Sequence, residues 1–460
     1  MTILLAAFQL PPIAILGLGI VLVILLITKL GMHPFFALLV TGMVVGMLSA
    51  SLPGEGSHWI KAIETPLAEM GKLAGKIAFV IALAAVIGIC LTESGAADKI
   101  VLRFVAVLGE KRAGVALLLS GFVLSVPVFF DTVFFLLIPL ARALARQVGK
   151  NYVLFVMAMA GGAVITHSLV PPTPGPLLMT EAYRILLGSG ILGGVLMGLP
   201  PAFFALWLAK KIDARMPLSP VGSESDATSF SEEGLPSFGL SILPVLLPVL
   251  LVTSVSIVDT LGQDKSKAWY QALSFFGNKN MALLIGTLLA VSLVVRKLGR
   301  DREALQGFVN DALQTAGVII LITSAGGAFG AMIGHSGIKE SIQGLSADGR
   351  GLILLAWGVA AVMKIAQGSG TVAMITTSSI MASIISKSDL GFHPIYIYMA
   401  TGFGSMFISW MNDSGFWVVG RMSGFTEKQT LKTWTVLLAA IGVFGLLQTL
   451  LVSYLLPFAG

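Results

Sequence analysis

The chain has 460 residues, of which 56% are hydrophobic and only 11% are charged, and its mean hydropathy is +0.92. A soluble domain carries about 25% charged residues, so this composition excludes a soluble globular protein and indicates an integral membrane protein. The net charge of +6 does not indicate nucleic-acid binding, because excess Lys and Arg is typical of the cytoplasmic loops of membrane proteins. The single cysteine, Cys90, excludes an intramolecular disulfide and a cysteine metal cluster.

Long apolar segments with few or no charges follow one another along the chain. Many approach the roughly 20 residues that a spanning helix needs, whereas a β-barrel would show alternating segments of about 10 residues, which are not visible. The first segment lacks a charged leading region and is followed by further spans, so we expect a retained helix and not a signal peptide. The predicted spans and apolar passages are Ile13 to Leu30, Pro34 to Ala50, Ile77 to Leu91, Gly114 to Ala145, Tyr152 to Val170, Ile185 to Leu208, Leu240 to Val258, Met281 to Val295, Ala316 to Gly334, Gly351 to Ile385, Pro394 to Trp410 and Trp434 to Leu456.

Two stretches between these segments are polar. Residues 51–76 are mixed in charge and are predicted to form a partly amphipathic loop. Residues 210–236 begin with basic side chains and become rich in Ser, Glu and Gly, without a periodic pattern that could bury a core. This second stretch is predicted to be a polar cytoplasmic linker between a first membrane repeat, residues 1–209, and a second membrane repeat, residues 237–460.

Three pairs of motifs support this division, because they repeat at nearly the same offset. The paired motifs are Glu93-Ser94-Gly95-Ala96 with His335-Ser336-Gly337-Ile338, Thr132 with Thr371, and Thr173-Pro174-Gly175 with Asp413-Ser414-Gly415. Their offsets are 242, 239 and 240 positions. Three markers in one order indicate an internal repeat. We therefore expect an all-α integral membrane protein of two repeats with about 12 membrane segments.

Basic residues indicate the orientation of the chain. Lys210, Lys211 and Arg215 precede two spans, and the basic cluster Arg296 to Arg302 follows them, so both clusters can lie in the cytoplasm. If the repeats are inverted, the first helix then runs from the outside to the inside, which places Lys29 in the cytoplasm.

Four helix breaks fall within apolar passages, two in each half. They lie around Pro127, at His167 to Pro176, at Gln367 to Thr371 and at Trp410 to Gly415. Broken backbone at membrane depth is tolerated only against protein or a water-filled cavity. Paired breaks point to the midplane substrate site of a secondary transporter, because half-helix N-termini offer unpaired N–H groups and positive dipole ends to an anion. A packing kink is the structural alternative for each break.

Three ionisable side chains lie in these passages. Asp131 is an acid surrounded by apolar residues, where a carboxylate costs at least about 2.5 kcal/mol, so it is a candidate to take up and release a proton. Lys364 is a base in a similar setting; it could form a structural ion pair with Asp131 or attract an anionic substrate. His167 precedes the proline run and is either a second proton carrier or a hydrogen-bonded core residue.

Several motifs of other function classes are absent from the sequence. No Gly-x-x-x-x-Gly-Lys-Ser/Thr run is present to bind ATP, and no His-Glu-x-x-His helix is present to bind zinc. We therefore expect no cofactor and no metal, and transport driven by an ion gradient. An intramembrane enzyme using His167 or Asp131 is the alternative from another class, but no motif places a nucleophile beside a base.

The sequence resembles the gluconate permease (GntP) family within the ion transporter superfamily. The resemblance covers nearly the whole chain, and the motifs that carry it are Phe129-Phe130-Asp131, His167 to Pro176, Gln367-Gly368-Ser369-Gly370-Thr371-Val372-Ala373, Asn412-Asp413-Ser414-Gly415-Phe416-Trp417 and Thr426 to Trp434. It implies proton-coupled uptake of sugar acids such as gluconate, with relatives that carry D-serine, across a bacterial inner membrane. It also implies inverted-topology repeats with broken helices and re-entrant hairpins, divided into scaffold and transport domains and often assembled as a homodimer.

Two departures from the family lie within the predicted site. Family members carry a longer Glu within Phe-Tyr-Glu-Val-Gly-Phe where this chain has Asp131, and often Pro-His-Pro where it has Pro172-Thr173-Pro174. Both departures bear on the identity of the substrate. An amino-acid or dicarboxylate carrier, including a sodium-coupled one, is therefore kept as the alternative.

The predicted substrate is a small hydroxylated monocarboxylate that moves together with a proton. Its carboxylate is predicted to contact half-helix N-termini, aided by a cation, and its hydroxyls to contact polar side chains, whereas helix capping is the alternative role of Asp413 and Ser414. The predicted substrate-binding residues are Thr173, Pro174, Gly175, Lys364, Gly368, Ser369, Gly370, Thr371, Asn412, Asp413 and Ser414. The predicted proton-coupling residues are Asp131 and His167, with Asp131 preferred.

Overall fold

The computed structural model describes residues 10–53, 55–220, 234–260, 265–299, 301–337, 349–385, 390–411 and 413–458. Every regular element within these ranges is helical. The first half contains α2 (Pro12–Thr28), α3 (Pro34–Leu48), α4 (His58–Glu93), α5 (Ala96–Leu108), a 3-10 turn (Glu110–Arg112), α6 (Ala113–Leu124), α7 (Phe130–Val148), α8 (Tyr152–Leu169), α9 (Pro174–Ala182) and α10 (Leu187–Arg215). The second half contains α11 (Phe238–Thr260), α12 (Ala268–Phe276), α13 (Lys279–Leu298), α14 (Arg302–His335), α16 (Gly351–Gln367), α17 (Gly370–Ile385), α18 (Ile395–Gly404), α19 (Ser414–Ser423), α20 (Glu427–Thr430), a π-helical turn (Leu431–Thr435) and α21 (Val436–Leu455).

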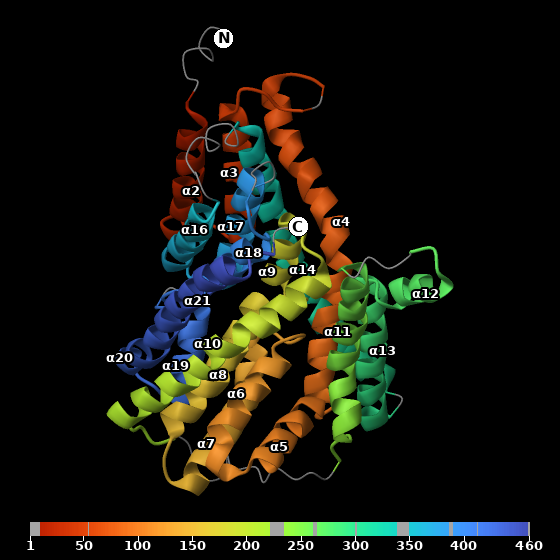
Figure 1. Cartoon of the computed structure of the whole chain (residues 1–460), viewed down its shortest axis with the longest axis vertical. Helices are drawn as coiled ribbons and strands as arrows, with labels where there is room; N and C mark the ends of the chain where they lie inside the picture. The colour runs from red at the N-terminus through yellow and green to blue at the C-terminus, as the bar shows by residue number, and fades with distance from the viewer. Residues whose placement is uncertain are drawn as a thin grey trace.

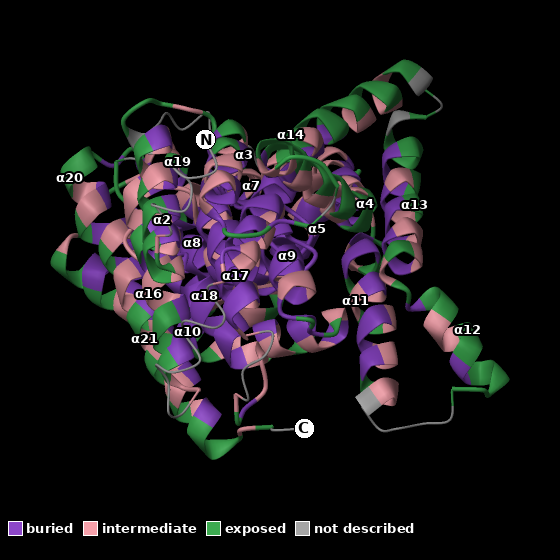
Figure 2. Cartoon of the chain, turned by 90° about the horizontal axis from the view of Figure 1, so that it is seen from above, coloured by how far each residue is buried: buried purple, intermediate pink, exposed green. Residues whose placement is uncertain are grey.

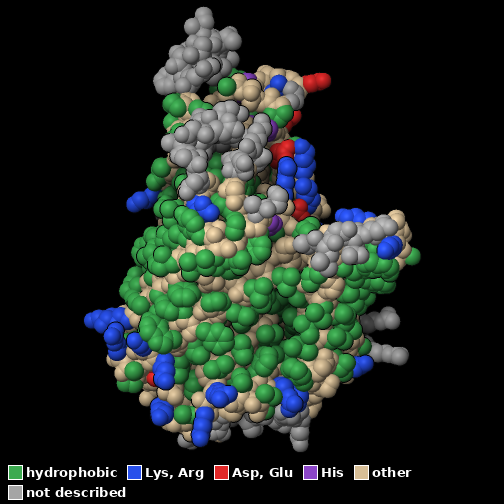
Figure 3. Space-filling model, in the orientation of Figure 1, with side chains coloured by type: hydrophobic (Ala, Val, Ile, Leu, Met, Phe, Trp, Pro, Cys, Tyr) green, Lys and Arg blue, Asp and Glu red, His purple; other side chains and the backbone are tan. Residues whose placement is uncertain are grey.

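The described helices confirm the prediction of an all-α integral membrane protein. Seven of them are long and apolar enough to cross a membrane, and five shorter apolar helices accompany them, in agreement with about 12 membrane segments. Hydrophobic side chains cover the middle of the surface in Figure 3, and Lys and Arg gather along its lower edge, near α5 and α7 in Figure 1. A basic edge beside an apolar belt is the pattern expected of a cytoplasmic membrane face.

The helices of the two halves follow the same order. In each half a long helix, α4 or α14, precedes two interrupted helix pairs and a long closing helix. The interrupted pairs are α6–α7 and α8–α9 in the first half, and α16–α17 and α18–α19 in the second. The four interruptions coincide with the four predicted helix breaks. This order agrees with the predicted repeats.

The linker begins later than predicted. Helix α10 continues through Lys210 and Lys211 to Arg215, six residues beyond the predicted boundary at residue 209. Residues 221–233 of the predicted linker lie outside the described residues. The basic side chains that opened the predicted linker are therefore part of the last turns of a membrane helix.

The predicted loop at residues 51–76 is wrong over most of its length. Helix α4 runs without interruption from His58 to Glu93, and the Ser57 hydroxyl caps it by accepting a hydrogen bond from the Ile60 amide at 3.4 Å. Its first turns carry Lys and Glu side chains on an amphipathic helix, which a search for uninterrupted apolar runs does not detect. For the same reason α14 begins at Arg302, before the predicted start of its apolar passage at Ala316.

Two of the helix breaks have a local cause in the sequence. Helix α8 ends at Leu169 because Pro171 and Pro172 cannot continue its hydrogen bonding, and α9 restarts with Pro174 at its first position. Helix α16 ends at Gly368, whose φ of +82° is a left-handed conformation that favours glycine. The break after α8 is also tied to the second half, because the Tyr398 hydroxyl donates a hydrogen bond to the Leu169 carbonyl at 2.7 Å.

The interrupted helices form the centre of the molecule. Figure 2 shows α8, α9, α17 and α18 as mainly buried, whereas α12 and α20 lie at the edge and are partly exposed. In the apolar window of α8 and α9, 83% of the residues are buried, against 33% in α10. The broken helices are therefore surrounded by protein on most sides, as their free backbone groups require.

Helix α17 packs directly on the backbone of α14 at two glycines. A Cβ atom at Gly326 would lie 1.9 Å from Ile375 Cγ2, and one at Gly330 would lie 2.1 Å from Ser379 Cβ and 2.7 Å from its backbone. Both contacts are spaced by four residues on each helix, which is one helical turn. The absence of side chains on this face of α14 lets the two helices approach each other closely.

Replacing Gly330 by Ala is expected to lower the free energy of unfolding by about 1–3 kcal/mol, because the added methyl group overlaps Ser379. Thermal unfolding in detergent measures the change. Gly317→Ala is the matched control on the same helix, because a Cβ there has no neighbour within 4 Å. Its stability should be unchanged or raised by up to about 1 kcal/mol. Equal melting temperatures for the two variants would contradict the close contact between α14 and α17.

Candidate functional site

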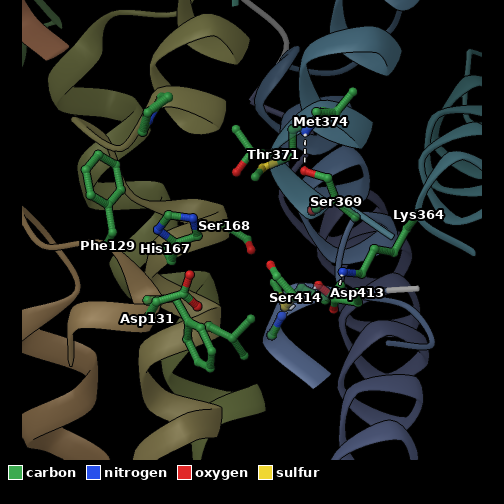
Figure 4. A pocket seen from close by; sticks show the side chains of 18 of the residues that line it. Phe129, Asp131, His167, Ser168, Lys364, Ser369, Thr371, Met374, Asp413 and Ser414 are labelled. Atoms are coloured by element: carbon green, nitrogen blue, oxygen red, sulfur yellow. Dashed lines mark hydrogen bonds and ion pairs between the residues drawn. The ribbon is translucent and has the colours of Figure 1, made fainter. Parts of the chain in front are cut away.

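A cavity of about 410 Å³ lies where the helix breaks of both halves meet. Figure 4 shows its two walls: Phe129, Asp131 and His167 come from the first half, and Lys364 and Asp413 lie opposite them on the second half. A volume of about 300–1,000 Å³ is typical of small-molecule sites. We refer to this space as the central cavity.

Four helix N-termini line the central cavity. They are the first turns of α7 at Asp131, of α9 at Pro174, of α17 at Thr371 and of α19 at Ser414. The first backbone N–H groups of a helix have no partner within the helix, and the helix dipole adds partial positive charge there. Pro174 and Pro176 have no N–H group, so α9 offers few donors, and the ends of α7, α17 and α19 are the ones that favour the binding of an anion.

A buried ion pair forms part of the second-half wall. Lys364 Nζ, on the last turn of α16, lies 2.6 Å from Asp413 Oδ2 and also donates a hydrogen bond to the Gly368 carbonyl at 2.6 Å. Asp413 caps α19 by accepting a hydrogen bond from the Gly415 amide at 3.0 Å. The capping role that the sequence allowed for Asp413 is therefore present, together with a second role as the partner of Lys364.

Two further side chains hold Asp413 in place. The Ser409 hydroxyl donates a hydrogen bond to Asp413 Oδ2, and Trp434 Nε1 donates to the Ser409 hydroxyl at 2.8 Å. Trp434 belongs to the π-helical turn before α21 and is almost completely buried. The position of the carboxylate is thus set by three separate elements of the second half, α16, α19 and this turn.

The first-half wall carries ionisable groups that have no protein partner. Within the described part of the chain, the Asp131 carboxylate forms no hydrogen bond and no ion pair. The structural pair between Asp131 and Lys364 that the sequence left open is therefore not formed, because Lys364 pairs with Asp413 instead. His167 packs edge-on against Phe129 with ring centroids 6.4 Å apart, and its buried Nδ1 has no hydrogen-bond partner among the described residues.

Hydroxyl groups complete the lining of the cavity. The side chains of Ser168, Thr371 and Ser414 have no hydrogen-bond partner in the described ranges. The Ser369 hydroxyl accepts a hydrogen bond from the Val372 amide at 3.2 Å, which leaves its proton free to donate. These groups can form hydrogen bonds with the hydroxyls of a small polar molecule.

The structure brings most of the predicted site residues to this one cavity. Thr173, Gly175 and Gly368 do not line it, and Asn412 lies outside the described residues. The Thr173 hydroxyl instead donates to the carbonyls of His167 and Val170, at 2.9 and 2.8 Å. The predicted residues that line the cavity are Asp131, His167, Pro174, Lys364, Ser369, Gly370, Thr371, Asp413 and Ser414.

Sequence reasoning missed several residues of the site. Ser409 and Trp434 were not singled out as site residues, although Trp434 ends one of the motifs that carry the family resemblance. Thr315 and Thr323 line the cavity from α14, which has no break and therefore gave no sequence signal. Ser168, next to His167 in the chain, could have been found from its position at the helix break.

Comparison with known proteins shows the family of the chain. The model of the family described as GntP family permease matches residues 11–455. The chain belongs to this family. It is 33% identical over 439 residues to the gluconate permease of Pseudomonas aeruginosa, covering 94% of this chain and 95% of that one. It is 30% identical over 447 residues to the Gnt-II system L-idonate transporter of Escherichia coli, covering 97% of this chain and all of that one.

A solved structure supports the fold. The chain is similar to the Neisseria gonorrhoeae MtrF structure with a TM-score of 0.63 and 13% sequence identity, covering 95% of this chain and 97% of that one. Identity at this level shows a shared fold and nothing about the substrate. The GntP permease family confirms the resemblance seen in the sequence, and its members are permeases, so the protein is a transporter and not an enzyme. It is a multi-pass protein of the bacterial inner membrane.

Proposed function

We propose that the protein imports gluconate or a related sugar acid together with one proton, with the substrate bound in the central cavity. The observation that carries this proposal is the arrangement of charge across the cavity. Asp131 has no partner on one wall, and Lys364 is neutralised by Asp413 on the other. Gluconate permeases among the relatives support the choice of a sugar acid.

The charges of the cavity couple anion binding to proton binding. When Asp131 is ionised, the three groups sum to one negative charge, and a carboxylate substrate is repelled. When Asp131 is protonated, they sum to zero, and the helix N-termini favour the anion. Because coupling between two ligands is reciprocal, the bound anion also favours the protonated form of Asp131. One proton therefore accompanies one monocarboxylate.

The polar groups of the cavity suit a hydroxylated acid. The substrate carboxylate contacts the N-termini of α17 and α19, close to Lys364. Its hydroxyls bond the side chains of Ser168, Thr371 and Ser414, which have no protein partner in the described ranges. A site built to hydrogen-bond hydroxyls discriminates strongly against analogues that lack them, because its buried polar groups are then left unpaired.

Proteoliposomes with an imposed pH gradient test the proposal. Purified protein should accumulate labelled gluconate when the outside is more acidic, and a protonophore should abolish the accumulation. A gradient of about one pH unit is worth about 1.4 kcal/mol and supports about tenfold accumulation by one-to-one symport. Uptake that requires sodium and ignores the pH gradient would remove the proton from the proposal.

Competition experiments test the substrate class. Unlabelled L-idonate should inhibit gluconate uptake, and D-serine should not, because an amino acid carries an ammonium group and few hydroxyls. Inhibition by D-serine without inhibition by L-idonate would favour an amino-acid carrier.

The homodimer implied by the family resemblance stays a prediction.

A further inference from the structure

A second cavity, larger than the first, lies beyond α9 and α17 from the central cavity. Its volume is about 1010 Å³, and it is lined by the last turns of α9, α14 and α17 and by the first half of α4. Helix α8 begins directly after the basic cluster Arg142, Arg146 and Lys150, so its first residue lies on the cytoplasmic side. Helix α9 follows α8 across the proline break, so the cavity at the last turn of α9 is assigned to the outer side. We refer to this space as the outer vestibule.

One helical turn separates the two cavities on each of three helices. Pro174 of α9, Thr323 of α14 and Ile375 of α17 line the central cavity, and the residues four positions further on each helix line the outer vestibule. These residues are Leu178, Gly327 and Ser379. Four residues of α-helix correspond to about 6 Å. The partition is thus a single layer of side chains.

Close packing fills this layer. A Cβ atom at Gly326 would overlap Ile375, and one at Gly175 would lie 2.4 Å from Met374 Cε. The partition therefore consists of apolar side chains of α17 packed on glycines of α9 and α14. A solute in the outer vestibule is therefore about one helical turn away from the central cavity.

The outer vestibule carries basic side chains without acidic partners. Glu69 is paired with Lys72 at 2.6 Å, and Glu181 is paired with Lys279. Lys76 and Arg184 also line the vestibule, and neither forms an ion pair within the described part of the chain. The described lining therefore holds two cations whose charge is not neutralised by an acid.

Two further observations indicate a binding surface. Arg184 has a φ of +56°, a left-handed conformation that a non-glycine residue rarely adopts and that clusters at ligand clamps. Ser379, only 7% exposed, has a hydroxyl without a hydrogen-bond partner in the described ranges. An arginine in a rare backbone conformation and an unpaired hydroxyl thus lie on the same lining as Lys76.

We infer that the outer vestibule is a second anion-binding site, in which Lys76 and Arg184 hold the carboxylate of the substrate before it crosses the partition. This inference rests on the proposed function, because it uses the same anionic substrate. Charges at the rim of a site act mainly on the rate of association, and their effect depends on ionic strength. The site therefore lowers the KM for uptake from outside and leaves the maximal rate unchanged.

Initial rates of gluconate uptake by proteoliposomes of zwitterionic lipid test this inference. The double variant K76Q/R184Q should raise KM about tenfold at low ionic strength and leave the maximal rate within about twofold of the wild type. The difference should shrink as salt rises from about 0.01 M to about 1 M, where the screening length falls from about 30 Å to about 3 Å. The matched control is E69Q/K72Q, which removes the paired charges of Glu69 and Lys72 from the same vestibule and leaves its net charge unchanged; its KM should not change.

Different results would contradict the outer site and the proposed function. An unchanged KM in K76Q/R184Q, or an equal rise in E69Q/K72Q, would overturn the outer site while the wild type still transports. A rise in KM that appears only in vesicles containing anionic lipid would assign the two cations to lipid headgroups and would also overturn it. Wild-type protein that takes up no gluconate in any vesicle would contradict the proposed function itself. The conservative variant Arg184→Lys should keep most of the wild-type KM, because it retains the charge.

Discussion

Replacing Lys364 by Met is expected to abolish gluconate binding and to lower the free energy of unfolding by about 3–5 kcal/mol. Lys364 is 4% exposed, and its ammonium group lies 2.6 Å from the Asp413 carboxylate. Without the lysine, Asp413 is a buried charge without a cation, and the cavity carries two acidic groups that repel an anionic substrate. Thermal unfolding in detergent and equilibrium binding of labelled gluconate measure the two effects.

A double variant separates the structural role of Lys364 from its role in binding. Lys364→Met with Asp413→Asn removes both charges, and Asn is as good a helix N-cap as Asp, so α19 keeps its first turn. Most of the lost stability should return, because replacing both partners of a buried pair costs far less than removing one. Gluconate binding should stay weaker than in the wild type, because the ammonium group beside the substrate carboxylate is gone, although the summed charge of the cavity is unchanged. Binding restored to the wild-type level would show that Lys364 acts only through the fold.

Much of the fold follows from local sequence signals. The four helix breaks were predicted from prolines and glycines within apolar passages, and each coincides with an interruption of a helix. The same hydropathy reasoning failed for the first turns of α4 and α14. There, charged side chains lie on amphipathic helices, and their helical conformation depends on the capping residues Ser57 and Asp301 as well as on packing. Apolar length alone does not detect such turns.

The pairing of charges could not be predicted from the sequence. Asp131 and Lys364 were recognised as ionisable groups in apolar passages, and Asp413 as a polar group or cap at a helix break. Only the packing of α16 against the break before α19 decides which of them pair. The roles of Ser409 and Trp434 depend on the same packing, since their hydrogen bonds join the break to the π-helical turn. The sequence indicates the kinds of groups present, and the tertiary fold selects their partners.

The helix breaks have different roles. Thr173 was predicted from the sequence as a substrate ligand, but its hydroxyl donates hydrogen bonds to the carbonyls of His167 and Val170 at the proline run. Gly175 has no side chain and therefore leaves room for Met374. The proline break is therefore mainly a structural element that holds the first turn of α9 against α17. The break before α19 presents Asp413 and Ser414 to the central cavity. The break before α19 thus contributes a charged and a hydroxyl side chain to the lining of the cavity.

Replacing Asp131 by Asn is expected to abolish proton-driven accumulation of gluconate and to retain gluconate exchange. Asn resembles the protonated carboxyl in shape and charge, so the cavity can still bind the anion. It cannot release a proton, so a pH gradient should give a concentration ratio of about one where the wild type reaches about ten for each pH unit. Counterflow of labelled gluconate in preloaded proteoliposomes measures exchange, and net uptake under a pH gradient measures coupling.

The pH dependence of binding distinguishes this role of Asp131 from a structural one. In the wild type, gluconate affinity should fall as pH rises, because ionisation of Asp131 adds a negative charge to the cavity; in Asp131→Asn this dependence should disappear. Asp131→Glu keeps a titrating carboxyl and should keep driven uptake. Asp213→Asn is a control for the substitution itself, because Asp213 accepts a hydrogen bond from the Leu154 amide at 3.2 Å away from the central cavity. If Asp131→Asn accumulates gluconate normally, the coupling proton is carried elsewhere, and His167 is the remaining titratable group on that wall.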